Sequence, residues 1–283
     1  SKPTVVTIHD VIPLEFPDAY PVGLKGTLRF WKQKFAVTGV EAVITDSEYS
    51  RQQILRYLPV KDEQVHVVPL AANPALDVPS TEVIQQTRTS LKLPEKYILY
   101  VGDINYNKNI PTLISALTEL PDEIKLVMVG HNFKPQPIPE WRAIQETIQE
   151  HQLDNRVLML SDITGDANET LSTLYNQALC YVQPSRSEGF GLTVLEAMQC
   201  QTPVVTSDMG SLPEVAGDAA IKVVPTAAGL ASGMLLDNDH KVQFHGGITF
   251  QSGESQNCSR GQSSSSRQNR TSQLVDYASG AAL

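Results

Sequence analysis

The sequence is poor in cysteine, in aromatic residues and in basic charge, and it has no long hydrophobic run. Only 6% of its 283 residues are aromatic, and its three cysteines, Cys180, Cys200 and Cys258, stand far apart without the spacing of a metal site. We therefore expect buried or incidental free thiols, as in a cytosolic protein. No apolar stretch approaches the about 20 residues that a membrane-spanning helix needs, so no such helix is expected.

Acidic residues outnumber basic ones, with 31 Asp and Glu against 22 Lys and Arg and a net charge of −9. This balance argues against a nucleic-acid partner, because proteins that bind nucleic acids usually carry a basic excess. The six histidines form no cluster with ligand spacing, so we expect no metal site. The length suits two modest domains of about 100–200 residues each, and the 41% hydrophobic content supports a real core.

Apolar periodicity predicts alternating strands and helices in the first part of the chain. The expected strands are Thr4–Ile8, Ala42–Thr45 and Val65–Val68, and the expected helices are Leu24–Thr38 and Ser47–Tyr57. Asp46 or Ser47 would cap the second of these helices. The proline-containing segment 69–94 reads as a mixed connection between two domains.

From Tyr97 onward the alternation is regular. Strands are expected at Tyr97–Gly102, Lys125–Gly130, Arg156–Leu160, Leu179–Gln183, Pro203–Thr206 and Ala220–Val224, and helices at Ile110–Leu120, Pro139–Gln152, Glu169–Gln177, Leu192–Cys200 and near Leu212. Short apolar strands that alternate with amphipathic helices predict a parallel, doubly wound sheet. Ligands of such a sheet bind beyond the carboxyl ends of its strands.

The pattern stops near Thr226. Residues 251–270 are rich in Ser, Gln, Asn, Gly and Arg and nearly free of large apolar residues. Such a composition cannot bury enough surface to offset its conformational entropy. We expect an irregular tail over 226–283, disordered from about residue 240.

The segment 187–198 is the most informative part of the sequence. Two carboxylates, Glu188 and Glu196, bracket a Gly-Phe-Gly turn that follows a strand and leads into a helix. A glycine turn exposes backbone N–H groups, and a helix start adds the positive end of a dipole, so the turn suits a phosphate. Glu196 is the one charge in an apolar helix, and a buried carboxylate needs hydrogen-bond donors such as sugar hydroxyls.

This pattern resembles the Glu-x7-Glu motif of the retaining, nucleotide-sugar-dependent glycosyltransferases of family 4, which have the two-domain GT-B fold. Further blocks carry the resemblance on both sides of the motif: Tyr100–Val101–Gly102, Asn107–Lys108–Asn109, Thr202–Pro203–Val204–Val205, Gly210–Ser211–Leu212–Pro213–Glu214–Val215 and Gly217–Asp218–Ala219–Ala220. The resemblance covers roughly residues 4 to 225. It implies an α/β fold of two Rossmann-like, doubly wound parallel-sheet domains.

The resemblance also implies a domain organisation. Residues 1–75 would be the C-terminal part of the N-terminal, acceptor-binding domain, and 76–225 the C-terminal, nucleotide-sugar-binding domain. The first domain would be incomplete, because only three strands precede the connection where the family has about twice as many. The family also has long helices after residue 226 that return to the first domain, so we expect truncation at the start of the chain and alteration at its end.

The resemblance assigns roles to individual residues. Lys108 would bind the donor diphosphate, Glu196 the ribose hydroxyls and Glu188 the donor sugar. The N–H groups of Phe190, Gly191 and Leu192 would cradle the phosphate, with Gly189 and Gly191 needed for backbone shape. His9 would face the transferred sugar, and Ile163 would lie near the base. His9 and Glu188 are thus the catalytic candidates, and no protein nucleophile is assigned.

Three positions depart from the family pattern. Asp103 stands where the family often has an arginine, and Arg186 is a candidate to supply the missing cation. Ser161 and Gln201 each stand where glycine is common, and a helix end at Gln201 without glycine is less favourable.

We therefore expect a hexosyltransferase that takes its sugar from a nucleotide diphosphate sugar, with retention, and needs no metal or other cofactor. Mannose from a GDP-sugar is the favoured donor, and a glycan or lipid-linked molecule is the expected acceptor. A non-catalytic nucleotide-sugar-binding fragment and a GT-B epimerase remain as alternatives. We expect a cytoplasmic protein, with peripheral contact to the inner membrane face through the missing N-terminal part as an open possibility.

Overall fold

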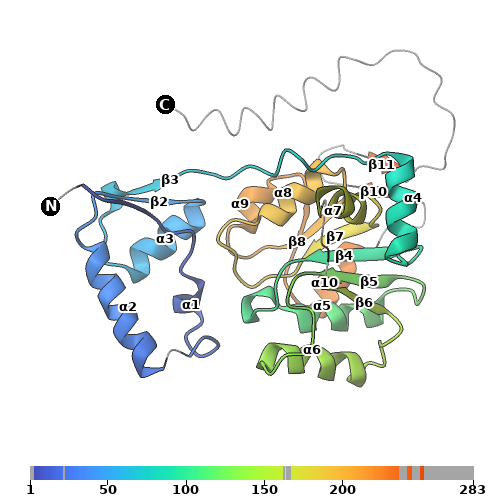
Figure 1. The fold of residues 1–283 in the computed structure, drawn as a ribbon, viewed down its shortest axis with the longest axis horizontal. Coiled ribbons are helices and arrows are strands. Elements are labelled where there is room, and N and C mark those ends of the chain that lie inside the picture. The colour runs from blue at the N-terminus through green and yellow to red at the C-terminus, as the bar shows by residue number, and fades with distance from the viewer. Residues whose placement is uncertain are drawn as a thin grey trace, which may run out of the picture.

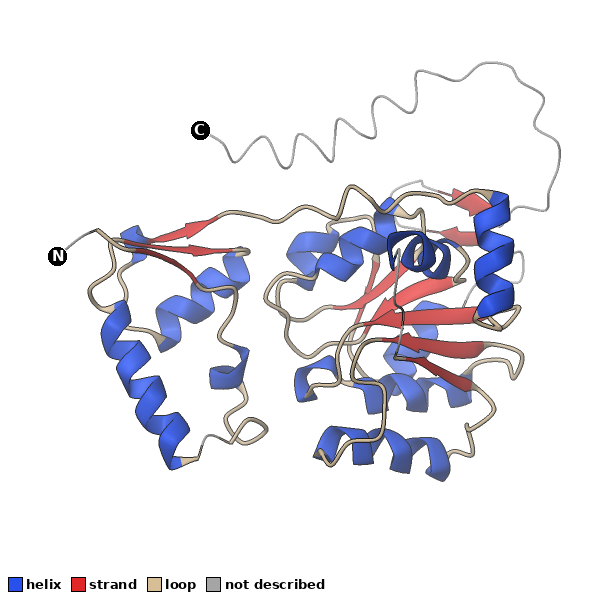
Figure 2. Ribbon diagram, viewed as in Figure 1, coloured by secondary structure: helices blue, strands red, loops and turns tan. Residues whose placement is uncertain are grey.

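The computed structural model describes residues 3–21, 23–161, 163, 167–235, 241–243 and 249–251. It contains a three-stranded parallel sheet, here called the first unit, and a six-stranded parallel sheet, the second unit (Figures 1 and 2). This is the α/β architecture predicted from the sequence. No helix of the described residues is both long and apolar enough to cross a bilayer.

The first unit has the strand order β1-β2-β3, with β1 at Val5–Thr7, β2 at Ala42–Thr45 and β3 at Val65–Val67. Its helices are α1 (Ile12–Glu15), α2 (Leu24–Val37) and α3 (Glu48–Tyr57), and a 3-10 turn covers Asp62–Gln64. Of the two predicted caps for α3, Ser47 is the one used, because its hydroxyl accepts the Ser50 N–H at 3.0 Å. A small core around Val43 and Ile54 holds the unit together.

The second unit has the strand order β6-β5-β4-β7-β8-β9. Its strands are β4 (Tyr97–Val101), β5 (Lys125–Val129), β6 (Val157–Leu160), β7 (Cys180–Gln183), β8 (Val204–Ser207) and β9 (Ile221–Val223). Its helices are α4 (Thr81–Ser90), α5 (Ile110–Ala116), α6 (Pro139–Glu150), α7 (Ala167–Asn176), α8 (Leu192–Gln199), α9 (Leu212–Ala216) and α10 (Ala227–Met234), with 3-10 turns at Tyr106–Lys108 and Leu117–Glu119. Every predicted strand is present within one or two residues of its expected ends.

Both faces of the larger sheet are buried, as a parallel sheet requires. Alternate residues of β4 point to opposite sides, so that Ile98 and Tyr100 pack with α5, α6 and α10, while Tyr97 and Leu99 pack with α7, α8 and α9. Cys180 and Cys200 are buried, and burial raises their thiol pKa values to about 12 and about 11. The expectation of buried free thiols is confirmed for these two, and Cys258 lies outside the described residues.

The connection between the units is mixed, as expected, but it includes a helix that was not predicted. Its second half forms α4, whose N-terminus is capped by the Ser80 hydroxyl, which accepts the Val83 N–H at 3.4 Å. The extended part before it is fixed to the second unit, because Gln199 donates a hydrogen bond to the Asn73 carbonyl at 2.9 Å and Leu76 is buried. The prolines that flank α4 obscured its apolar pattern.

The expectation of an irregular tail from residue 226 is wrong for α10. The Thr226 hydroxyl caps this helix, and Leu230, Ala231 and Met234 are buried in the core. A side chain at Gly233 would meet Val205 at 2.8 Å, so this glycine allows the helix to approach β8 closely. Two glycines in eight residues lower the helix propensity, and tertiary burial overrides it. Lys241–Gln243 (β10) and Thr249–Gln251 (β11) also form an antiparallel pair, and the rest of 236–283 lies outside the described residues.

Replacing Leu230 with alanine should lower the free energy of unfolding by about 2–5 kcal/mol, because it removes a fully buried side chain and leaves a cavity. Leu235→Ala is the matched control, since Leu235 directly follows the same helix and is 55% exposed. Urea denaturation of both variants measures the difference. Equal stability of the two would show that α10 does not belong to the core.

Candidate functional site

The two loops that carry the predicted donor site meet at the switch point of the six-stranded sheet. From β4 the chain first builds β5 and β6 on one side and then returns to build β7, β8 and β9 on the other. Loops that leave the carboxyl ends of β4 and β7 therefore start from neighbouring strands, at the place where ligands of such sheets bind. Arg186 N–H donates to the Asn107 carbonyl at 2.7 Å, and the Asn107 side chain donates to the Ser187 carbonyl at 3.0 Å, so the two loops are fixed to each other.

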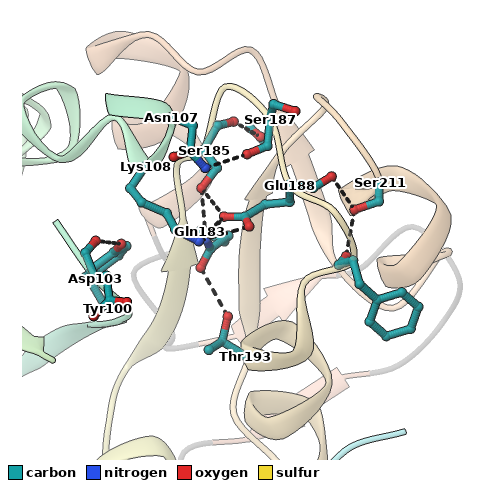
Figure 3. A network of polar contacts seen from close by, with 12 residues as sticks. Tyr100, Asp103, Asn107, Lys108, Gln183, Ser185, Ser187, Glu188, Thr193 and Ser211 are labelled. Carbon is teal, nitrogen blue, oxygen red and sulfur yellow. Dashed lines mark hydrogen bonds and ion pairs between the residues drawn. The ribbon is translucent and has the colours of Figure 1, made fainter. Parts of the chain in front are cut away.

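Glu188 is the centre of a dense polar network between these two loops (Figure 3). Its Oε1 accepts hydrogen bonds from Lys108 Nζ at 2.8 Å, Gln183 Nε2 at 2.6 Å and Ser185 Oγ at 2.6 Å, and its Oε2 accepts a second one from Lys108 at 2.9 Å. The Glu188 side chain is 9% exposed and that of Lys108 20%. Burial of a carboxylate requires such pairing, so the structure joins two of the predicted donor residues in one ion pair.

Gln183 and Ser185 were not among the predicted site residues. Gln183 is the last residue of the buried strand β7, and its oxygen accepts a hydrogen bond from Tyr181, while its nitrogen also donates to Ser185 at 2.9 Å. The signal in the sequence was a glutamine and a serine directly after a run of apolar residues, where polar side chains need partners.

The carbonyl groups of residues 188–190, at the Gly-Phe-Gly turn, accept hydrogen bonds from serine hydroxyls. Ser211 Oγ donates to the carbonyls of Glu188 at 2.9 Å and Phe190 at 2.8 Å, and Ser47 Oγ donates to that of Gly189 at 2.6 Å. In the part of the chain that the structure describes, the N–H groups of Phe190, Gly191 and Leu192 have no acceptor. They lie at the start of α8, where the helix dipole is positive.

Gly191 has a structural reason to be glycine. Its φ of +106° lies in the left-handed region, and a side chain there would meet Leu212 at 2.9 Å. Gln201 adopts a positive φ of 61° just after α8, which is the conformation for which the family position prefers glycine. The chain therefore ends α8 in the expected shape in spite of this departure.

Glu196 lies on α8, and its carboxylate accepts a hydrogen bond from a residue that was not predicted from the sequence. Tyr175, a buried residue of α7, donates its hydroxyl proton to Glu196 Oε2 at 3.0 Å. Desolvation raises the pKa of Glu196, and the Tyr175 hydrogen bond acts in the opposite direction. One tyrosine therefore holds one carboxylate oxygen, and Glu196 is partly rather than fully buried.

His9 reaches the same region from the first unit. Its Nδ1 shares a hydrogen bond of 2.7 Å with Asp46 Oδ2, while 67% of the side chain is exposed. Its carbonyl oxygen lies so close to Gly189 that a Cβ there would stand 3.1 Å away. The loop after β1 therefore touches the Gly-Phe-Gly turn at residues 189–191, here called the donor turn because it is predicted to bind the donor.

The side chains of the remaining candidates, Ile163 and Arg186, make other contacts. Ile163 packs against the core cluster that contains Tyr97 and Leu174, and its neighbours 162 and 164–166 lie outside the described residues. The Arg186 guanidinium lies 4.6 Å from the centre of the Tyr106 ring, a cation–π contact. Within the described residues, no group of three or more His, Cys, Asp or Glu side chains is arranged to hold a metal ion.

Two family models match this chain. The model of the glycosyl transferases group 1 matches residues 83–238, and the model of glycosyltransferase family 4 matches residues 1–76. The first match covers more than half of the chain and contains both the loop after β4 and the loop after β7. The chain therefore belongs to the glycosyl transferases group 1.

Individual relatives agree with this assignment. O-antigen chain mannosyltransferase B of Escherichia coli is 28% identical over 244 residues, which cover 83% of this chain and 60% of that protein. Sucrose-phosphate synthase from Thermosynechococcus elongatus superposes with a TM-score of 0.67 at 28% identity, over 81% of this chain and 57% of the other. Anabaena HepE (Alr3699), solved with UDP-glucose, has a TM-score of 0.68 at 22% identity over 82% and 62%. The fold is of the GT-B type, and the chain spans about three fifths of the length of these proteins.

Proposed function

We propose that this chain is the donor-binding part, with some of the acceptor side, of a retaining hexosyltransferase that uses a nucleotide diphosphate sugar. Residues 1–75 then belong to the acceptor domain and 76–225 to the donor domain. The favoured donor is GDP-mannose, because several relatives are named as mannosyltransferases. The acceptor is a glycan or a lipid-linked molecule. We further propose that the reaction takes place in the cytoplasm and needs no metal.

The observation that carries this proposal is the position of the Lys108–Glu188 pair beside unpaired N–H groups at the switch point. Breaking the bond between the anomeric carbon and the diphosphate oxygen leaves negative charge on the diphosphate. The Lys108 ammonium and the N–H groups of Phe190, Gly191 and Leu192 are positive groups fixed in advance, and such groups stabilise developing charge without reorganisation. Glu188 Oε2, which accepts its hydrogen bond from Lys108, would then be available to the hydroxyls of the donor sugar.

The remaining candidate residues have consistent places in this scheme. Glu196, with one oxygen bonded to Tyr175, has further acceptor capacity for ribose hydroxyls. His9, which is mostly exposed and hydrogen-bonded to Asp46, would donate a hydrogen bond to the sugar from the first unit. Ile163 would contact the base.

Calorimetric titration with GDP, UDP, ADP and TDP tests the proposal. We expect one nucleotide to bind clearly more tightly than the others, with affinity unchanged by a metal chelator. Assays with the matching sugar nucleotides then separate transfer from binding alone, since a non-catalytic fragment binds without turnover and an epimerase converts the donor without an acceptor. If none of the four nucleotides binds, the proposed donor site is wrong for this chain.

A further inference from the structure

The first unit holds the donor turn directly through the N-terminus of α3. Ser47 Oγ and Ser50 Oγ both donate to the Gly189 carbonyl oxygen, at 2.6 and 2.9 Å, and both serines are almost completely buried. The contact is tight, because a Cβ at Gly189 would stand 2.9 Å from the Asp10 Cβ. These hydrogen bonds join residues that are about half a chain apart in sequence.

A carboxylate of the second unit completes the cap of the same helix. Glu214 of α9 accepts the Glu48 N–H at 2.9 Å with Oε1 and the Tyr49 N–H at 3.3 Å with Oε2. The first N–H groups of a helix have no partner within the helix, and the helix dipole favours a negative charge there. α3 therefore takes part of its N-terminal cap from the other unit.

The same short helix that carries Glu214 also touches the turn. Ser211, the residue before α9, donates to the carbonyls of Glu188 and Phe190. Glu214, the turn and the N-terminus of α3 therefore form one connected set of contacts across the two units. Tyr49 adds a further contact, since its hydroxyl donates to Glu15 at 2.6 Å and Ser187 donates to the same carboxylate at 3.1 Å.

We propose that Ser47, Ser50 and Glu214 form an interdomain clasp that positions the donor turn. In a trans peptide the C=O and the following N–H lie in one plane and point in opposite directions, and the described chain has no cis peptide bond. Holding the Gly189 carbonyl on the α3 side therefore directs the Phe190 N–H to the opposite side. The three residues are positioning residues, since they act on the turn and not on the reacting atoms.

The clasp makes the donor site dependent on the first unit. When the units separate, the Gly189 carbonyl loses both hydroxyl donors, and its peptide is free to rotate. Donor binding and closure of the units then favour each other by the same factor, as thermodynamic linkage requires. This inference rests on the proposed function, because it assumes that the turn binds the donor.

The test compares Glu214→Ala and Ser50→Ala with Ser80→Ala. Ser80→Ala is the matched control, because it removes the cap of another ten-residue helix, α4, within the connection and second unit. The dissociation constant of the nucleotide that the wild-type chain prefers is measured by calorimetry. Pulsed electron paramagnetic resonance between labels at Glu63→Cys and Asn155→Cys, with Cys258→Ser, reports the distance between the units.

We expect Glu214→Ala to weaken nucleotide binding about tenfold, which corresponds to the loss of a typical helix cap, and to broaden the distance distribution. Ser50→Ala should weaken binding about threefold to tenfold, as the loss of one hydrogen bond does. Ser80→Ala should lower the melting temperature and leave both readouts unchanged.

Wild-type affinity in Glu214→Ala and Ser50→Ala overturns the positioning role, whatever the distances show. A loss of affinity as large in Ser80→Ala overturns it as well, since general destabilisation would then explain the effect. If the wild-type chain binds no nucleotide, the proposed function is refuted, but the clasp is not. The distances between the two labels then test whether the clasp joins the units. An unchanged distribution in Glu214→Ala then refutes the clasp.

Discussion

Replacing Lys108 with methionine is expected to lower the rate of sugar transfer about 10²–10³-fold, the range seen when one fixed group that stabilises transition-state charge is removed. The same change should lower the free energy of unfolding by about 3 kcal/mol, because it leaves the Glu188 carboxylate buried without its counter-ion. Initial rates with the matching sugar nucleotide and urea denaturation measure the two effects separately.

The double variant Lys108→Met with Glu188→Gln, compared with the single variant Glu188→Gln, separates the chemical role of Lys108 from its structural role. A neutral amide at position 188 removes the buried charge and can still accept hydrogen bonds from Gln183 and Ser185. We expect most of the stability to return in the double variant, while its transfer rate stays well below that of Glu188→Gln alone. Wild-type transfer in the single Lys108 variant would contradict the diphosphate role, and transfer that returns with stability would show that Lys108 matters only for folding.

Replacing Glu196 with alanine is expected to weaken nucleotide binding about 10- to 100-fold, since hydrogen bonds to a charged group contribute about 1.5–3 kcal/mol. Glu196 is partly buried, and α8 places it near the Tyr175 hydroxyl rather than in the core. The fold should therefore be kept. Calorimetry with the preferred nucleotide and circular dichroism of the variant measure both properties.

The pH dependence of binding gives a second readout for Glu196. Desolvation raises the pKa of this carboxyl group, so its ionised form is lost at a higher pH than for an ordinary glutamate. We expect nucleotide affinity to fall as the pH decreases through this raised pKa, and the dependence to disappear in Glu196→Ala.

Tyr175→Phe is the matched control for Glu196. It removes only the hydroxyl that donates to the carboxylate and leaves the carboxylate oxygen that we propose binds ribose, so we expect only about a threefold loss, as for one neutral hydrogen bond. An affinity for nucleotide that is the same in Glu196→Ala and in the wild-type chain would refute the ribose role.

Local patterns in the sequence were sufficient for most of the second unit. Strands such as Tyr97–Val101 are short apolar runs that only a sheet buried on both faces accommodates, and the helices between them show a 3.6-residue period. Three helices were missed. α1 is a single turn of four residues that includes a proline, and α4 and α10 lack a clear apolar period. α4 lies among prolines, and α10 is built largely of alanine and glycine, so each is defined by its caps and its packing more than by its own pattern.

The residues of the candidate site also fall into two groups, those predicted from the sequence and those found only in the structure. The spacing from Glu188 to Glu196 and the position of Lys108 after a strand follow from the sequence, because a motif of residue types and its place at a strand end are local properties. Gln183, Ser185 and Tyr175 were missed, since a polar side chain beside a carboxylate in space has no fixed distance from it along the chain.

The sequence by itself determined the family, the alternation of strands and helices and the residues of the donor motif, since all of these depend on short-range periodicity and spacing. Only the tertiary structure decided that the β4 and β7 loops meet at a switch point, that Lys108 pairs with Glu188, and that Ser47, Ser50 and Glu214 join the two units at Gly189. These contacts connect residues 80 to 166 positions apart. The order of strands in a sheet and the docking of one unit on another bring such residues together. Both depend on long-range contacts, so a short segment of sequence does not determine them.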